Sequence, residues 1–295
     1  MRICWCAASE EVSVRASESP SRPVQVIAVT GGKGGVGKTS VAGNLATALA
    51  ARRRVMLFDG DLGLANVDVF LGLPARYTMA HVLSGERSLE EIVLRTPQGL
   101  RVVPAASGVA RLASLGATEH LALVQAFSSI AGDLDVLIVD TAAGIAHGVL
   151  QFSQAAQQVL VVVCDDPASM TDAYALVKVL SRDHGVRRFR VLANLTRGAG
   201  DGEALFRRFE RVTGRFLDVN LEYVGEIPED PCLRRSVREQ RPVCEAYPGS
   251  PAARAFKKLA ERADNWPVAA EPRGNLEFFW ERLVRPPVPR LEVVQ

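Results

Sequence analysis

A glycine-rich octet near the amino terminus constrains the fold of this chain more than any other feature. It runs from Gly32 to Thr39, reads GKGGVGKT, and fits the phosphate-loop pattern G-x-x-x-x-G-K-[ST]. A β-branched, apolar run at 24–30 precedes it, and an alanine-rich helical run at 40–51 follows it. Strand, glycine loop and helix are the context in which this pattern binds phosphate, so the sequence predicts a nucleotide site.

The octet also predicts which groups hold the nucleotide. Backbone N–H groups of the loop are expected to wrap the phosphates, and the N-terminus of the next helix adds partial positive charge. Lys38 is expected to reach the β- and γ-phosphates, and the Thr39 hydroxyl to bind Mg²⁺. The predicted phosphate-binding set is Gly32, Lys33, Gly34, Gly35, Val36, Gly37, Lys38, Thr39 and Ser40.

Length and composition fit one large α/β domain with appendages. The chain has 295 residues, is 48% hydrophobic, and carries a formal charge of +2, which argues neither for nor against a nucleic-acid partner. No apolar run approaches the roughly 20 residues that cross a bilayer, and the apolar stretch at 3–8 is too short for a secretion signal. The five cysteines are scattered without a C-x-x-C pair, so we expect a reduced, cytoplasmic protein.

Strand-like runs alternate with helical patterns along the chain, which predicts a doubly wound, mainly parallel sheet flanked by helices. The expected strands after the first are 55–59, 100–104, 136–140, 159–164, 189–194 and 223–227. Further helices are expected at 118–130, 171–181, 202–212 and 251–263. The expected organisation is a disordered leader at 1–22, a nucleotide-binding domain at 23–266, a linker at 267–274, an amphipathic helix at 275–285 and a disordered tail at 286–295.

The second lysine of the octet makes the loop more specific. GKGGVGKT resembles the deviant Walker A motif of the MinD/ParA-type ATPases. The resemblance implies an ATPase that forms a homodimer with ATP, in which Lys33 crosses the interface to the partner's ATP. Its chemistry would be that of an arginine finger, a cation supplied in trans to the charge that develops during phosphoryl transfer.

Further site residues follow from the same resemblance. Strand-like runs end in Asp-Gly-Asp at 59–61 and in Asp140. The resemblance implies that Asp61 orients or deprotonates the attacking water, that Asp59 supports the Mg²⁺ shell and that Asp140 holds Mg²⁺ through water. Residues 141–144 resemble the second switch of the family. The resemblance also implies that Asn194 reads the adenine by its side-chain amide and that Pro228 packs on the base.

Four stretches resemble the FleN/FlhG branch of this family in particular: 62–69, 103–108, 171–178 and 275–284. Members of that branch are cytoplasmic ATPases that limit flagellar number. The resemblance implies a FleQ-type transcriptional activator as partner, the polar GTPase FlhF as a second one, and a place at the inner membrane near the pole. Some FlhG proteins carry an N-terminal D-Q-A-x-x-L-R element that stimulates FlhF, and residues 1–22 contain nothing like it.

The segment at 275–285 has a helical apolar stripe. Leu276, Phe279, Trp280 and Leu283 recur at spacings of three, four and seven. Such a helix after a flexible linker can lie in a membrane interface. It can equally dock on its own domain, and periodicity alone does not separate the two.

Other functions within the wider family stay open. A DNA-segregation ATPase of the ParA type would use a basic surface. The arginines that could form one are Arg187, Arg188, Arg190, Arg207, Arg208, Arg211 and Arg215. We expect most of them on solvated faces, and direct nucleic-acid binding is not predicted. A MinD-type division-site ATPase would share the chemistry and differ in its partner, whereas a metabolic member would need cluster cysteines or substrate residues that the sequence does not reveal.

Overall fold

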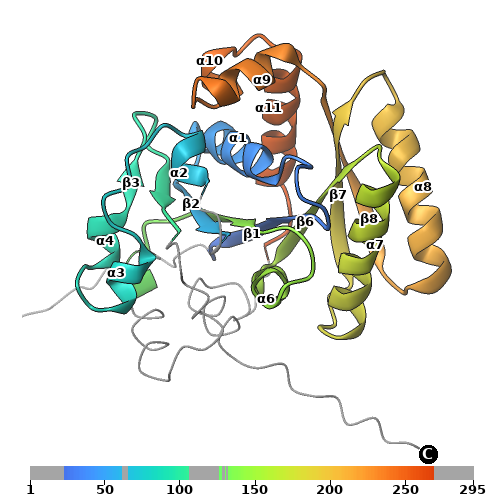
Figure 1. The fold of residues 1–295 in the computed structure, drawn as a ribbon, viewed down its shortest axis with the longest axis horizontal. Helices are drawn as coiled ribbons and strands as arrows, with labels where there is room; N and C mark the ends of the chain where they lie inside the picture. Colours follow the sequence, from blue (N-terminus) through green and yellow to red (C-terminus); the bar gives the residue numbers. More distant parts are fainter. Residues whose placement is uncertain (1–22, 62–65, 106–125, 128–129, 131, 269–295) are drawn as a thin grey trace, which may run out of the picture.

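The structure, a computed structural model, describes residues 23–61, 66–105, 126–127, 130 and 132–268. Its centre is an eight-stranded sheet with the order β3-β4-β2-β5-β1-β6-β7-β8 (Figure 1). Neighbouring strands are parallel except β3 and β4. The strands are β1 (Gln25–Thr30), β2 (Val55–Gly60), β3 (Leu94–Arg95), β4 (Arg101–Val103), β5 (Val136–Thr141), β6 (Gln158–Cys164), β7 (Arg188–Thr196) and β8 (Asn220–Pro228).

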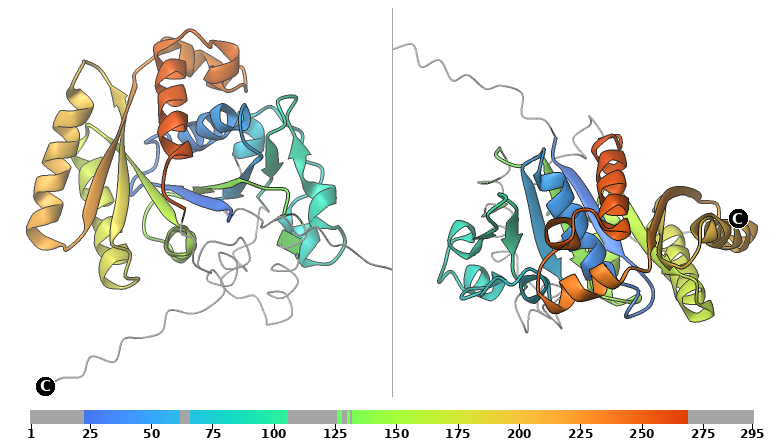
Figure 2. Two further views of the ribbon diagram at one scale, coloured as in Figure 1. Left: turned by 180° about the vertical axis from the view of Figure 1, so that it is seen from behind. Right: turned by 90° about the horizontal axis from the view of Figure 1, so that it is seen from above.

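Helices cover both faces of the sheet, as Figure 2 shows from behind and from above. One face carries α1 (Lys38–Ala50), α2 (Val67–Phe70), α9 (Pro231–Arg238), α10 (Val243–Ala246) and α11 (Pro251–Asp264). The other carries α3 (Met79–Leu83), α4 (Leu89–Ile92), α6 (His147–Ala155), α7 (Pro167–Arg182) and α8 (Asp201–Phe216). A sheet buried on both faces explains why the central strands read as continuous apolar runs.

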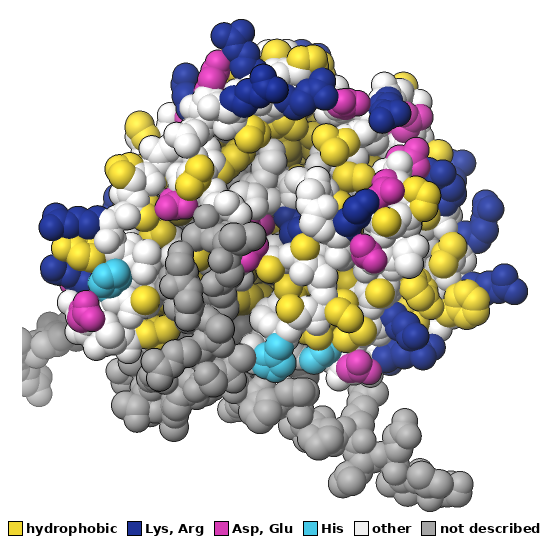
Figure 3. Space-filling model, in the orientation of Figure 1, with side chains coloured by type: hydrophobic (Ala, Val, Ile, Leu, Met, Phe, Trp, Pro, Cys, Tyr) yellow, Lys and Arg dark blue, Asp and Glu magenta, His cyan; other side chains and the backbone are white. Residues whose placement is uncertain are grey.

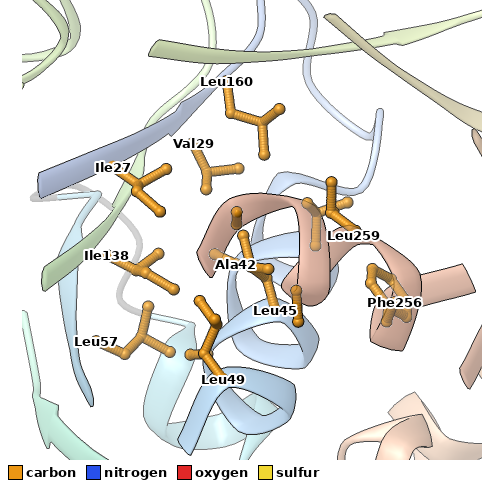
Figure 4. Packing of buried hydrophobic residues seen from close by; sticks show 14 of the residues in the cluster. Ile27, Val29, Ala42, Leu45, Leu49, Leu57, Ile138, Leu160, Phe256 and Leu259 are labelled. Carbon is orange, nitrogen blue, oxygen red and sulfur yellow. The ribbon is translucent and has the colours of Figure 1, made fainter. Parts of the chain in front are cut away.

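The hydrophobic core has separate parts on the two faces of the sheet, because successive strand side chains point to opposite faces. Ile27 and Val29 of β1 point to α1 and α11, whereas Val26 and Ala28 point to the opposite layer. Figure 4 shows α1 held between the sheet and α11, with Leu45 of α1 among the fully buried side chains. The first helix after the glycine loop is therefore fixed by tertiary packing on two sides.

The strand order places the glycine loop at a topological switch point. The chain passes from β1 through α1 to β2 on one side of β1, and later crosses from β5 to β6 on the other side. In open α/β sheets, ligands bind at the carboxyl ends of the strands where the order reverses. The loop between β1 and α1 lies at that edge.

The sequence-based prediction of a doubly wound, mainly parallel sheet is confirmed, and every run expected as a strand forms one. The helix expected at 171–181 begins earlier, at Pro167, because the Asp166 side chain caps it by accepting from the Ser169 N–H. Most of the helix expected at 118–130 and all of the amphipathic helix expected at 275–285 lie outside the described residues. Within the described part, no helix is long and apolar enough to span a bilayer.

Candidate nucleotide-binding site

The glycines of the octet have specific backbone and packing requirements. Gly35 and Gly37 adopt φ angles of 80° and 90°, in the left-handed region that favours glycine. A Cβ on Gly32 would lie 2.1 Å from the Asp172 carbonyl carbon, which belongs to the backbone of α7. A Cβ on Gly34, by contrast, would meet no described atom within 4 Å. The loop therefore depends on glycine for its shape and for its close approach to α7.

This contrast predicts that alanine substitutions at Gly32 and Gly34 lower the free energy of unfolding by different amounts. Gly32→Ala must push the loop away from α7, because helix backbone cannot yield as a side chain can. We expect a loss of about 1–3 kcal/mol in the free energy of unfolding. Gly34→Ala should change it by less than about 0.5 kcal/mol. Urea denaturation without nucleotide measures both, and equal losses would contradict the packing of Gly32 on α7.

Lys38 is buried at the start of α1 and has no ion-pair partner among the described residues. Its Nζ donates to the Lys33 carbonyl at 3.2 Å. Burial lowers the pKa of Lys38, while the charges of Asp140 and Asp61 oppose that shift. A buried cation beside an open loop is a site for an anion, as the sequence predicts for the phosphates.

Two acidic residues lie side by side at the carboxyl ends of β2 and β5, where Asp59 and Asp140 are paired in register. The Asp59 carboxylate accepts from the backbone N–H groups of Asp61 at 3.0 Å, Asn66 at 3.0 Å and Val67 at 3.2 Å. Burial nevertheless raises the pKa of Asp59 to about 6. Burial raises the pKa of Asp140 to about 8, although a hydrogen bond with Thr39 opposes this.

The raised pKa of Asp140 predicts how stability depends on pH without nucleotide. Its pKa lies at 3.8 ordinarily and at about 8 in the folded chain, so the folded state binds more protons across that window. The free energy of unfolding should therefore fall as pH rises from about 5 to 8. Asp140→Asn removes the titrating group, so its Tm should exceed that of the unsubstituted chain by a few degrees at pH 8. Calorimetry at pH 5, where the two should agree more closely, is the control, and a lower Tm for the variant at pH 8 would contradict the buried charge.

The residues present fit a Mg²⁺ ion accompanying the nucleotide. Oδ1 of Asp140 is buried and lacks a hydrogen-bond partner among the described residues, while the carboxylate is hydrogen-bonded to Thr39. Carboxylate and hydroxyl oxygens are ligands that Mg²⁺ prefers, with substrate phosphates completing the shell. No group of three or more His, Cys, Asp or Glu side chains in the described ranges could hold a metal alone. The geometry therefore suits an ion that arrives with phosphate oxygens.

The buried Asn194 joins the end of β7 to the glycine loop. Its Nδ2 donates to the Val36 carbonyl at 2.7 Å, and it lies 2.5 Å from the position of a Cβ on Gly37. Its Oδ1 is buried without a hydrogen-bond partner among the described residues. Pro228 ends the neighbouring strand β8, close to Asn194 in register. The Ser40 hydroxyl likewise is buried without a described partner.

Lys33 pairs with Asp166, which precedes α7. Its Nζ lies 2.5 Å from Oδ2 of Asp166, and the two side chains are 40% and 41% exposed. The hydrogen bond between them raises the pKa of Lys33 and lowers that of Asp166. The two lysines of the octet thus have different surroundings, since Lys38 is buried at the start of α1 and Lys33 is at the surface.

Two contacts of the site were not predicted from the sequence. Asp166 had a local signal, since Asp-Pro followed by Ser at the third helical position is typical of a helix N-terminus, but nothing local indicated its pairing with Lys33. Gly144, with a φ of 88°, donates its N–H to the Gly31 carbonyl at 3.2 Å. The predicted second switch at 141–144 therefore contacts the start of the glycine loop. The predicted membrane residues Leu276, Phe279, Trp280 and Leu283 lie outside the described residues.

Comparison with known proteins gives relatives along most of the chain. Residues 23–263 match the ParA family, described as NUBPL iron-transfer P-loop NTPase. The chain is 58% identical to the Antiactivator FleN of Pseudomonas aeruginosa over 90% of this chain and 95% of that protein. It is 31% identical to the Flagellum site-determining protein YlxH of Helicobacter pylori over 88% and 89% respectively. The solved structure of the septum site-determining protein MinD complexed with Mg-ADP from Pyrococcus horikoshii OT3 superposes with a TM-score of 0.63 at 28% identity, over 82% of this chain and 96% of that one.

Proposed function

The chain belongs to the ParA/MinD family of P-loop ATPases, in its FleN/FlhG branch, and on that premise we propose that it is an ATP-driven dimerisation switch that limits flagellar number. The observation that carries the flagellar role is the 58% identity to an antiactivator across 95% of that protein's length. The proposed switch rests on the contrast between the two lysines of the octet. Lys33 is at the surface, whereas Lys38 is buried and has no ion-pair partner among the described residues.

In this proposal each nucleotide-binding residue has a defined task. The loop N–H groups and Lys38 hold the β- and γ-phosphates, and Oδ1 of Asn194 accepts from the adenine amino group while Pro228 packs on the base. Mg²⁺ would be held by Thr39 and, through water, by Asp140 with Asp59 behind it, and it would neutralise phosphate charge. Asp61, whose charge acts on both Lys38 and Asp140, positions the attacking water.

The dimer completes the site. Lys33 leaves Asp166 and reaches the phosphates bound by the partner subunit, where it stabilises the transferring phosphoryl group. Because both side chains of the Lys33–Asp166 pair are about 40% exposed, breaking the pair costs little. Hydrolysis then needs two ATP-loaded subunits, which makes turnover slow and returns the chain to the monomer.

We further propose that the dimer is the form that meets its partners. A FleQ-type activator is the main one, and FlhF at the cell pole is the second. The segment at 275–285 would tie the dimer to the cytoplasmic face of the inner membrane. Three nearby arginines and two glutamates give one such segment weak attraction for anionic lipid, so two copies in the dimer would be needed for stable attachment.

DNA binding of the ParA type is the second candidate function. Ion pairs between the arginines of the predicted basic surface and nearby carboxylates weigh against it. Four of the seven arginines are engaged in ion pairs within the chain: Arg187 with Asp218, Arg190 with Glu222, Arg207 with Glu203 and Arg208 with Asp165. Each of these pairs places a carboxylate beside the arginine, which reduces the net positive charge that this surface offers to DNA phosphates.

Counting flagella tests the proposed function. A strain that lacks the gene should carry many flagella per cell, whereas a strain whose chain carries Asp61→Ala should carry few or none, because the switch would remain in its ATP-bound form. Electron microscopy of both strains measures this. Normal flagella combined with misplaced chromosomes or septa would overturn the flagellar role and leave the ATPase chemistry in place.

A further inference from the structure

A groove of about 390 Å³ lies between the edge strand β8 and helix α11, outside the residues used by the nucleotide cycle except at its Pro228 end. Its floor is apolar, with Leu192 and Val224 of the sheet against Leu259 of α11. Its outer wall consists of Arg254, Lys258 and Arg262, all exposed and spaced four residues apart on α11. In the view of Figure 3, lysine and arginine side chains gather at the top of the molecule, where Figure 1 draws α9 and α11.

The charges of α11 are divided between two sides. Its acidic residues Glu261 and Asp264 face α1, where they pair with Arg52 at 3.8 Å and Arg53 at 2.6 Å. Its three groove cations form no ion pair with any residue in the described ranges, although Arg254 donates to the Gly249 carbonyl. The groove therefore carries positive charge that the described chain leaves uncompensated.

The one carboxylate among the described residues that line the groove is turned away from these cations. Oε2 of Glu226 accepts the Gly202 N–H at 2.8 Å, which places this side chain against the start of α8. The Tyr223 ring packs on Phe206 of α8, with ring centroids 5.4 Å apart. A β-bulge lies between Tyr223 and Gly225 of β8. Val224 and Gly225 both line the groove, and Gly225 adds only backbone to it.

The inner wall of the groove is a strand with an open edge. β8 has nine residues, ends the sheet order, and pairs with β7 alone among the described strands. An edge strand of this length presents unpaired N–H and C=O groups to any extended chain that reaches it. Binding of a peptide as an added strand is an established mode of protein recognition.

We propose that this groove binds an extended, acidic segment of a partner protein, which adds to the edge of β8 and pairs its carboxylates with Arg254, Lys258 and Arg262. The repeats match, because side chains four residues apart on a helix rise by about 6 Å and alternate side chains of a strand by about 6.6–6.8 Å. Acidic residues at every second position would therefore meet one cation each. A membrane surface or a DNA duplex would neutralise the cations but leave the edge of β8 unpaired.

The test uses the full-length chain and fluorescein-labelled nine-residue peptides of alternating valine and glutamate. Fluorescence anisotropy should show binding at least about fivefold tighter than that of a peptide of equal composition with the residues in two blocks. Lys258→Glu should weaken binding about tenfold, since it replaces an attraction with a repulsion. Lys257→Glu is the matched control, because Lys257 lies one residue away on α11 and borders a different cavity beside Cys244. It should change binding less than about twofold.

A third peptide, alternating but N-methylated at every second residue, tests strand addition itself. It keeps the charges and removes the donors that would pair with β8, so its binding should fall to the level of the block peptide. Equal binding of all three peptides would overturn the proposal, and so would equal loss in the two lysine variants. Lys258-dependent binding to anionic vesicles or duplex DNA, without preference for the alternating peptide, would also overturn it. Unchanged ATPase activity of Lys258→Glu establishes that the variant is folded.

Discussion

Lys38→Ala is expected to weaken ATP binding at least a hundredfold while leaving the nucleotide-free chain as stable as before. Lys38 would make hydrogen bonds to two charged phosphate groups, and each such bond contributes about 1.5–3 kcal/mol, which together account for at least about a hundredfold in affinity. Its burial, without an ionic partner in the described part of the chain, lowers its pKa, which means that the folded chain holds this cation at a cost. Removing it should therefore not lower the free energy of unfolding.

Calorimetric titration with ATP and thermal melts without nucleotide measure the two halves of this prediction. Lys33→Ala is the matched control in the same loop. Lys33 pairs with Asp166 at the surface, and in the proposed mechanism it does not hold the phosphates of its own subunit. It should bind ATP within about threefold of the unsubstituted chain. ATP binding by Lys38→Ala at near-normal affinity would contradict the placement of Lys38, and a large drop in its Tm would contradict the unfavourable burial.

The sequence could predict the parts of the site that depend on neighbouring residues. The octet, the strand before it and the helix after it form one local unit, so both the loop and α1 followed from 24–51 alone. The ends of β2 and β5 could be located in the same way, because apolar runs stop at Asp59 and Asp140. That these two carboxylates are paired in register follows from the strand order, which is a property of the whole sheet.

The remaining contacts join segments far apart in the chain. The pair between Lys33 and Asp166 spans 133 residues, and Asn194 reaches the Val36 carbonyl across 158. Gly32 requires the absence of a side chain because the backbone of α7 at Asp172 passes beside it. Pattern and propensity carry no information on such approaches, which arise when helices pack on the sheet. The groove between β8 and α11 could not be predicted for the same reason, because the cations of α11 line a groove only where this helix packs beside the edge strand.

Mixing two inactive variants should restore ATPase activity if Lys33 acts across the dimer. Asp61→Ala loses the residue that positions water and should bind ATP, accumulate as dimer and lose about a hundredfold or more in rate. Lys33→Ala loses the cation supplied to the partner and should lose a similar factor. In a mixed dimer, the site on the Lys33→Ala subunit keeps its own Lys38 and Asp61 and receives Lys33 from the other subunit. One of its two sites is therefore complete.

The expected size of the rescue follows from counting dimers. With equal amounts and random pairing, half of the dimers are mixed and each has one complete site, so the mixture should reach at most about a quarter of the normal rate. Accumulation of Asp61→Ala with itself would lower that fraction. Phosphate release at fixed total protein measures it, and affinity tags on one variant verify that mixed dimers form. If Lys33 served the phosphates of its own subunit, every site in the mixed dimer would lack one residue and no activity would return. Mixed dimers without restored activity would therefore show that Lys33 serves the phosphates of its own subunit. The surface position of Lys33 beside Asp166 would then no longer support an ATP-driven dimerisation switch.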